Sequence, residues 1–155
     1  MRALAHPLRL RILRVTLDRP LTNKQIAGRL GRDPGTVLHH VRVLAANGFL
    51  VAEPVRAGQR GALERPYRAT GKSWRIRTRP DQGYTGSVLE AMRDEVLEAE
   101  PHAAVAMVRL GVRLGTDDLA ELRQRIIALG DEFEPRDDPG GEPIGILALA
   151  YRREP

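Results

Sequence analysis

Residues 21–50, LTNKQIAGRLGRDPGTVLHHVRVLAANGFL, predict a short helix, a tight turn, a second helix and a strand. The first helix begins at Thr22, whose hydroxyl can cap it, and Gln25 three positions later completes a capping box. Ile26 and Leu30 supply its apolar face, and Gly31 ends it. The stretch therefore carries its own start and stop signals.

The second helix, residues 34–47, follows almost at once. Asp33 can cap it, and Pro34 stands at the first helical position, where a missing N–H costs nothing. Val37, Val41 and Leu44 fall at i, i+4 and i+7, so they form one buried stripe and leave a polar side free. Two helices joined by a short turn, the second with a polar outer face, are typical of proteins that insert a helix into the major groove of DNA.

Charge is divided very unevenly along the 155 residues. Residues 1–80 hold 17 basic and 4 acidic side chains, whereas residues 81–155 hold 8 and 16, so a net charge of +13 precedes one of −8. This asymmetry favours a polyanion-binding first half beside a second half with another role.

Composition excludes several classes of protein. The chain has no cysteine, which excludes disulfides, thiolate metal sites and cysteine nucleophiles. An apolar content of 42% is sufficient for a core. The longest uncharged apolar run, 144–151, is far shorter than the roughly 20 residues that span a bilayer. No signal peptide is visible, so we expect a cytoplasmic protein without membrane contact.

The rest of the first half completes a recognisable pattern. Apolar residues at helical spacing predict a helix over about 3–17. Residues 50–55 and 67–70 have strand character and enclose the arginine-rich loop 56–65. Two strands around a basic loop after the second helix predict a wing that reaches the phosphate backbone or the minor groove.

The second half predicts a helix, a strand, a helix and a strand. Ser87 and Glu90 suggest a capping box that opens a helix to about residue 99. Residues 106–114 alternate as a half-buried strand, Thr116 opens another helix, and 144–151 is a strand that is apolar on both faces. We expect an α+β fold with three parts: a winged helix-turn-helix domain (1–78), a linker (79–86), and a small α/β domain for dimerisation or effector binding (87–155).

The segment from Leu4 to about Trp74 resembles the bacterial ArsR-type winged-helix regulators. The resemblance rests on AHPLRLRIL at 5–13, TVLHHV at 36–41, NGFL at 47–50 and YRAT at 67–70. It implies a homodimeric transcriptional regulator, usually a repressor, that binds double-stranded DNA. Leu38 stands where the family often has serine, and the cysteines through which many members sense metals are absent.

Candidate site residues follow from the pattern and the resemblance together. We expect DNA contacts on the helices, their turn and the wing: Thr22, Lys24, Gln25, Arg32, Thr36, Leu38, His39, His40, Arg42, Arg56, Gln59, Arg60 and Arg65. For His40 a packed side chain and a base contact remain open. We expect apolar dimer contacts from two helices: Leu4, Leu8, Leu89, Met92 and Val96.

Other functions find little support in the residues. Glu98 and His102 are four apart beside Asp94, but Pro101 interrupts the helix, so we expect no metal site and no cofactor. No serine, histidine and acid are placed for nucleophilic catalysis, so we expect no enzyme. A small-molecule effector is left open, and the alternative function is a winged helix that binds RNA or a protein through the same basic face.

Overall fold

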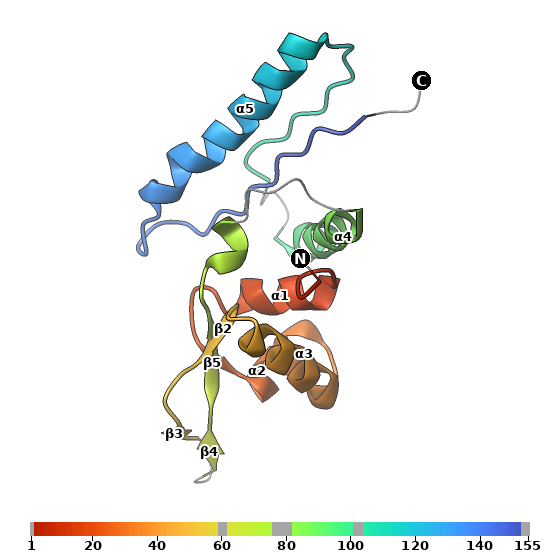
Figure 1. The fold of residues 1–155 in the computed structure, drawn as a ribbon. Coiled ribbons are helices and arrows are strands. Elements are labelled where there is room, and N and C mark those ends of the chain that lie inside the picture. The colour runs from red at the N-terminus through yellow and green to blue at the C-terminus, as the bar shows by residue number, and fades with distance from the viewer. Residues whose placement is uncertain (1, 59–61, 76–81, 101–103, 153–155) are drawn as a thin grey trace. The chain divides into compact units, whose positions relative to one another are not determined.

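The computed structural model describes residues 2–58, 62–75, 82–100 and 104–152. The chain divides into two compact units, Met1–Val105 and Ala106–Pro155 (Figure 1). The first unit extends beyond the expected domain end at 78, because it includes a helix that packs on the N-terminal helix.

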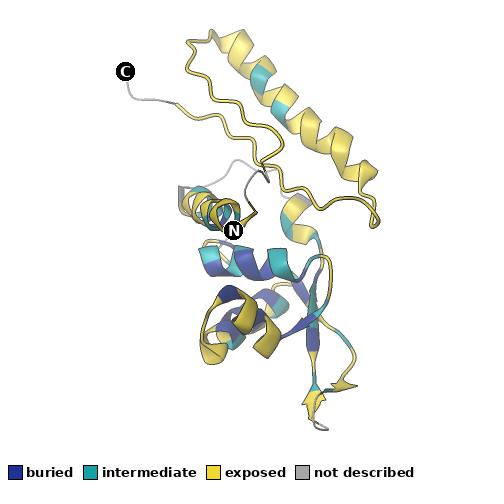
Figure 2. Cartoon of the chain, turned by 180° about the vertical axis from the view of Figure 1, so that it is seen from behind, coloured by how far each residue is buried: buried dark blue, intermediate teal, exposed yellow. Residues whose placement is uncertain are grey.

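Three helices build the core of the first unit: α1 (Pro7–Val15), α2 (Asn23–Leu30) and α3 (Pro34–Ala46). Their apolar stripes face one another, and the fully buried side chains are concentrated there (Figure 2). The stripe expected on α3 is confirmed, since Val37, Val41 and Leu44 are completely buried.

The predicted start and stop signals are confirmed in detail. Thr22 and Gln25 form a reciprocal capping box at the start of α2, and Gly31 ends that helix with a φ of 58°. Such a left-handed conformation suits glycine, which has no Cβ to clash. α1 is shorter than expected, because the ring of His6 caps its N-terminus ahead of Pro7.

A small antiparallel sheet closes the domain beside the helices. Its strands lie in the order β1 (Leu21–Thr22), β5 (Pro66–Ala69) and β2 (Leu50–Ala52). Beyond them, β3 (Arg56–Ala57) pairs with β4 (Leu63–Glu64) as a separate hairpin. The predicted wing is therefore present, and a short 3₁₀ helix, η2 (Lys72–Arg75), follows it.

Helix α4 (Gln82–Glu98) belongs to the first unit and packs on α1. It starts before the expected capping box, so Ser87 lies inside the helix, where its hydroxyl donates to the carbonyl of Gly83 at 2.9 Å. The nearly buried Arg11 of α1 pairs with Asp94 at 3.4 Å and also with Glu98. These ion pairs join α4 to the helical core.

The second unit contains α5 (Thr116–Phe133) and the short η3 (Glu134–Arg136). Gly115, not Thr116, is the N-cap of α5, and the helix continues through Gly130 to Phe133. Figure 1 shows the segments before and after α5 as extended chain running in the same direction, yet neither strand expected at 106–114 and 144–151 forms.

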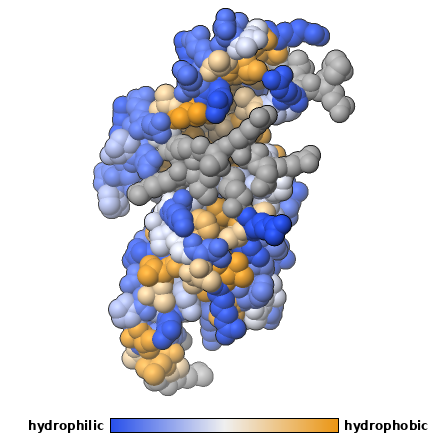
Figure 3. All heavy atoms as spheres, in the orientation of Figure 1, coloured by the Kyte–Doolittle hydropathy of each residue, from blue (hydrophilic) through white to orange (hydrophobic). Residues whose placement is uncertain are grey.

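The missing strands have a physical explanation. A strand needs hydrogen-bonded neighbours, and its apolar side chains need cover. In the described part of this unit no side chain is buried; Met107 is 91% exposed, Val108 81% and Tyr151 75%. Hydrophobic atoms accordingly reach the surface here (Figure 3). The α+β class with an N-terminal winged helix-turn-helix domain is confirmed, whereas the two C-terminal strands are not formed.

Candidate nucleic-acid interface

Helix α3 presents a polar face whose position is fixed by local contacts. The Asp33 carboxylate accepts hydrogen bonds from the backbone N–H of Thr36 at 2.9 Å and from its hydroxyl at 3.3 Å. Thr36, His39 and Arg42 are exposed, while the stripe on the opposite side is buried. Hydroxyl, imidazole and guanidinium groups can hydrogen-bond to base edges, so this face can carry sequence information.

His40 does not belong to that face. It is only 7% exposed, its Nδ1 accepts a hydrogen bond from Arg9 Nε at 3.2 Å, and its ring lies 4.4 Å from that of His6. Burial, followed by the positive charges nearby, lowers its pKa from 6.5 to about 4, so it is neutral at neutral pH. Of the two roles left open for His40, the structure therefore supports the packed side chain rather than the base contact. Leu38 is half-buried, which also limits its contact with DNA.

Two predicted residues at the start of α2 serve the helix itself. The Thr22 hydroxyl is buried and accepts from the backbone N–H of Gln25 at 3.3 Å, while Gln25 Oε1 accepts from the N–H of Thr22 at 2.9 Å. Lys24 is exposed beside them. The helix N-terminus is thereby oriented, and Lys24 is the charged group there that can reach a phosphate.

An arginine-lined groove of about 620 Å3 runs between α2 and the base of the wing. Arg19 comes from the segment before β1, Arg29 from α2 and Arg56 from β3. Among the described residues none of these three guanidinium groups has an ion-pair partner. Of these three arginines the sequence predicted only Arg56, because Arg19 and Arg29 come close to it only in the folded chain. The net positive charge of residues 1–80 was the signal in the sequence that pointed to them.

The wing supplies further positive charge. Arg56 and Arg65 are exposed, as expected for contacts to the phosphate backbone. Gln59 and Arg60, which we expected to contribute, lie outside the described residues. Arg68 is not free for DNA, since its Nε donates to Glu53 at 3.0 Å across the wing.

The residues expected at a dimer interface separate into two groups. Leu4 and Leu8 are buried in the helical core, at 0% and 9% exposure, so they are not on the surface of this unit. Leu89 and Val96 of α4 are exposed at 44% and 59%, and Met92 is half-buried. Only the α4 residues remain accessible to another chain.

Metal binding gains no support from the side chains that the structure describes. No three histidine or carboxylate groups come together there, and Asp94 and Glu98 both engage Arg11. His102, which we considered as a ligand, lies outside the described residues. In the same part of the chain no helix is long and apolar enough to cross a bilayer.

Comparison with known proteins agrees with this geometry. Residues 4–53, covering α1 to β2, match the family model of a helix-turn-helix domain. No curated protein matches the chain. The N-terminal part thus carries a helix-turn-helix domain of the kind that binds DNA in regulatory proteins, and its helix α2 borders the arginine-lined groove.

Proposed function

We propose that this protein is a sequence-specific, homodimeric transcriptional regulator that places α3 in the major groove. The observation that carries the proposal is the exposed polar face of α3 in a unit that also exposes three arginines, on α2, β3 and the segment before β1, with no ion-pair partner among the described residues. The helix-turn-helix match over residues 4–53 supports the same reading. A repressor of ArsR type is proposed from the resemblance of the first half to that family.

The interface divides its tasks between two sets of residues. Thr36, His39 and Arg42 face outward on α3 and are proposed to contact base edges, where bidentate or single hydrogen bonds discriminate between bases. The groove arginines and Lys24 are proposed to hold phosphates, which position the protein without reading sequence. His40 is omitted from this set, because its side chain is packed against Arg9 and His6.

A homodimer is proposed on the basis of the second unit. Its extended segments 104–114 and 144–151 have no strand partner in the described chain, and segment 144–151 is apolar on both faces. A helix and two short segments are too small to bury a sufficient core alone. A second copy supplies the same elements, and two-fold pairing also suits a winged helix that reads two half-sites about 34 Å apart.

Equilibrium binding tests the proposal directly. Fluorescence anisotropy should compare DNA from upstream of the protein's own gene with a scrambled duplex of equal length, across a series of salt concentrations. We expect a specific affinity about 10³-fold or more above the scrambled one. Equal and steeply salt-dependent binding to both duplexes would reject sequence specificity and bring RNA or a protein partner forward.

Light scattering during size-exclusion chromatography tests the dimer in the same preparation. We expect twice the chain mass of 17.2 kDa. A monomer that binds specific DNA would reject the homodimer while leaving DNA recognition intact. Expression of a reporter placed behind the bound DNA then separates repression, which lowers expression, from activation.

A further inference from the structure

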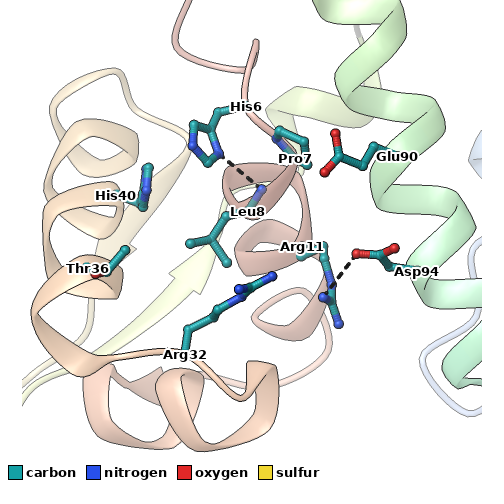
Figure 4. Close-up of a pocket in the computed structure, with 9 residues that line it drawn as sticks. All are labelled: His6, Pro7, Leu8, Arg11, Arg32, Thr36, His40, Glu90 and Asp94. Carbon is teal, nitrogen blue, oxygen red and sulfur yellow. Dashed lines mark hydrogen bonds and ion pairs between the residues drawn. The ribbon is translucent and has the colours of Figure 1, made fainter.

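A cavity of about 390 Å3 lies between the first turns of α1, the first half of α3 and one side of α4. All of these elements belong to the first unit. The volume lies in the range of about 300–1,000 Å3 that is usual for small-molecule sites. Figure 4 shows side chains from the three helices and from the turn before α3 around one space.

Histidines of the cavity supply hydrogen-bond donors rather than charge. Nδ1 of His6 accepts from the backbone N–H of Leu8 at 3.2 Å, and Nδ1 of His40 accepts from Arg9. A neutral imidazole that accepts at one nitrogen carries its proton on the other, so Nε2–H of each ring is a donor. Burial lowers the pKa of both rings, which keeps them neutral at neutral pH.

The charged residues around the cavity differ in whether they are already paired. Arg11 is neutralised by Asp94 and Glu98. Among the described residues, by contrast, neither the Arg32 guanidinium nor the Glu90 carboxylate has a hydrogen-bond or ion-pair partner. Arg32 extends from the turn before α3, whereas Glu90 projects from α4 (Figure 4). One unpaired cation and one unpaired anion thus border the same space from different elements.

We infer that this cavity binds a small zwitterion of the amino-acid class, with a carboxylate and an ammonium group. The carboxylate would accept from the Arg32 guanidinium, which suits it geometrically, and from the imidazole N–H groups. The ammonium group would donate to Glu90. A simple anion would leave Glu90 unpaired and close to negative charge, and a simple amine would leave Arg32 unpaired.

This site is connected to DNA binding, and that part of the inference rests on the proposed function. Arg32 and Thr36 border the cavity and also stand at the beginning of the helix proposed to enter the major groove. The sequence predicts Arg32 as a DNA contact, so a ligand that engages its guanidinium would withdraw that group from the DNA. By linkage, the ligand and the DNA then weaken each other by the same factor.

Isothermal titration calorimetry of the DNA-free full chain tests the site separately from the function. Common L-amino acids are titrated singly, and each one that binds is compared with the matched acid lacking the amine and the matched amine lacking the carboxylate. We expect at least one amino acid to bind saturably and more tightly than both truncated probes. No binding by any amino acid, or equal binding of the deaminated acid, would overturn the inference.

Two variants assign the contacts. Glu90→Gln should weaken amino-acid binding about tenfold or more and leave the deaminated acid unchanged, since only the ammonium contact is lost. Arg32→Ala should weaken both acids. Glu121→Gln, an exposed change on α5, is the matched control and should have no effect. If Glu90→Gln and Glu121→Gln behave alike while thermal unfolding shows both folded, the ammonium contact is refuted.

DNA binding then separates the two proposals. If the amino acid binds and DNA binds, but the ligand does not change the DNA affinity, the coupling through Arg32 is wrong and the site alone stands. If DNA does not bind specifically at all, the proposed function fails, while the calorimetry still decides the presence of the site.

Discussion

Protonation of the buried His40 should make the stability of the first unit depend on pH. The folded protein holds this histidine neutral with a pKa of about 4, whereas the unfolded chain takes up the proton near 6.5. The stabilisation is therefore complete above pH 6.5 and is lost as the pH falls toward 4. A difference of about 2.5 pKa units corresponds to a loss of at most about 3 kcal/mol.

Urea unfolding followed by circular dichroism measures this loss at a series of pH values from neutral to about 4. The informative variant is His40→Gln, because the amide oxygen of glutamine can still accept from Arg9 but does not titrate. We expect the free energy of unfolding of His40→Gln to fall less with pH than that of the unmodified protein. His39→Gln, on the exposed face, is the control and should keep most of the dependence, because His39 is the smallest of the causes that lower the pKa of His40.

The pKa of His6 is lowered in the same direction as that of His40, chiefly by burial. His6 is present in every protein compared, so the difference between His40→Gln and the unmodified protein reports the titration of His40 together with its coupling to the adjacent His6. The reasoning is refuted if His40→Gln and the unmodified protein lose stability in parallel.

Three further changes test the interface and its support. The double variant Arg19→Ala, Arg29→Ala should reduce the slope of log K against log salt concentration by about 2, because two phosphate contacts are lost. An unchanged slope would show that the groove does not contact DNA. Arg42→Ala should weaken specific binding more than non-specific binding by anisotropy, and equal losses would make it a phosphate contact. Arg11→Met should speed amide hydrogen exchange in α4, because the ion pairs of Arg11 with Asp94 and Glu98 are lost. If exchange stays as slow as in the control variant Arg123→Ala, apolar packing alone holds α4 on the core.

Local signals in the sequence were sufficient for the helix-turn-helix segment. Thr22 with Gln25, Gly31 and Asp33 act within a few residues of where they stand, so their roles can be read without knowing the rest of the fold. The wing was predicted for the same reason, since strand, loop and strand follow directly in the chain.

Features that depend on distant contacts were missed. Ser87 matches a capping box, yet α4 continues through it because the helix packs on α1 and ends up longer than its local signals require. His40 lies one position from the exposed His39, and only the proximity of Arg9 and His6 shows that it is packed. The groove arginines are far apart in sequence and meet only in the fold.

The strands expected in the second unit show a different limit. Alternation of apolar residues indicates that a segment can form a strand, but not which chain supplies its neighbour. Segment 106–114 has this alternation and segment 144–151 is apolar on both faces, yet both lack a strand neighbour in the described chain.

The separation of buried and exposed positions on α3 has an evolutionary consequence. Val37, Val41 and Leu44 hold the helix in place, whereas Thr36, His39 and Arg42 make no contribution to that stripe. Substitutions at exposed positions usually change stability by only about 0.5 kcal/mol. After gene duplication, a copy could therefore diverge toward a different operator through these three codons alone while it inherits the scaffold unchanged.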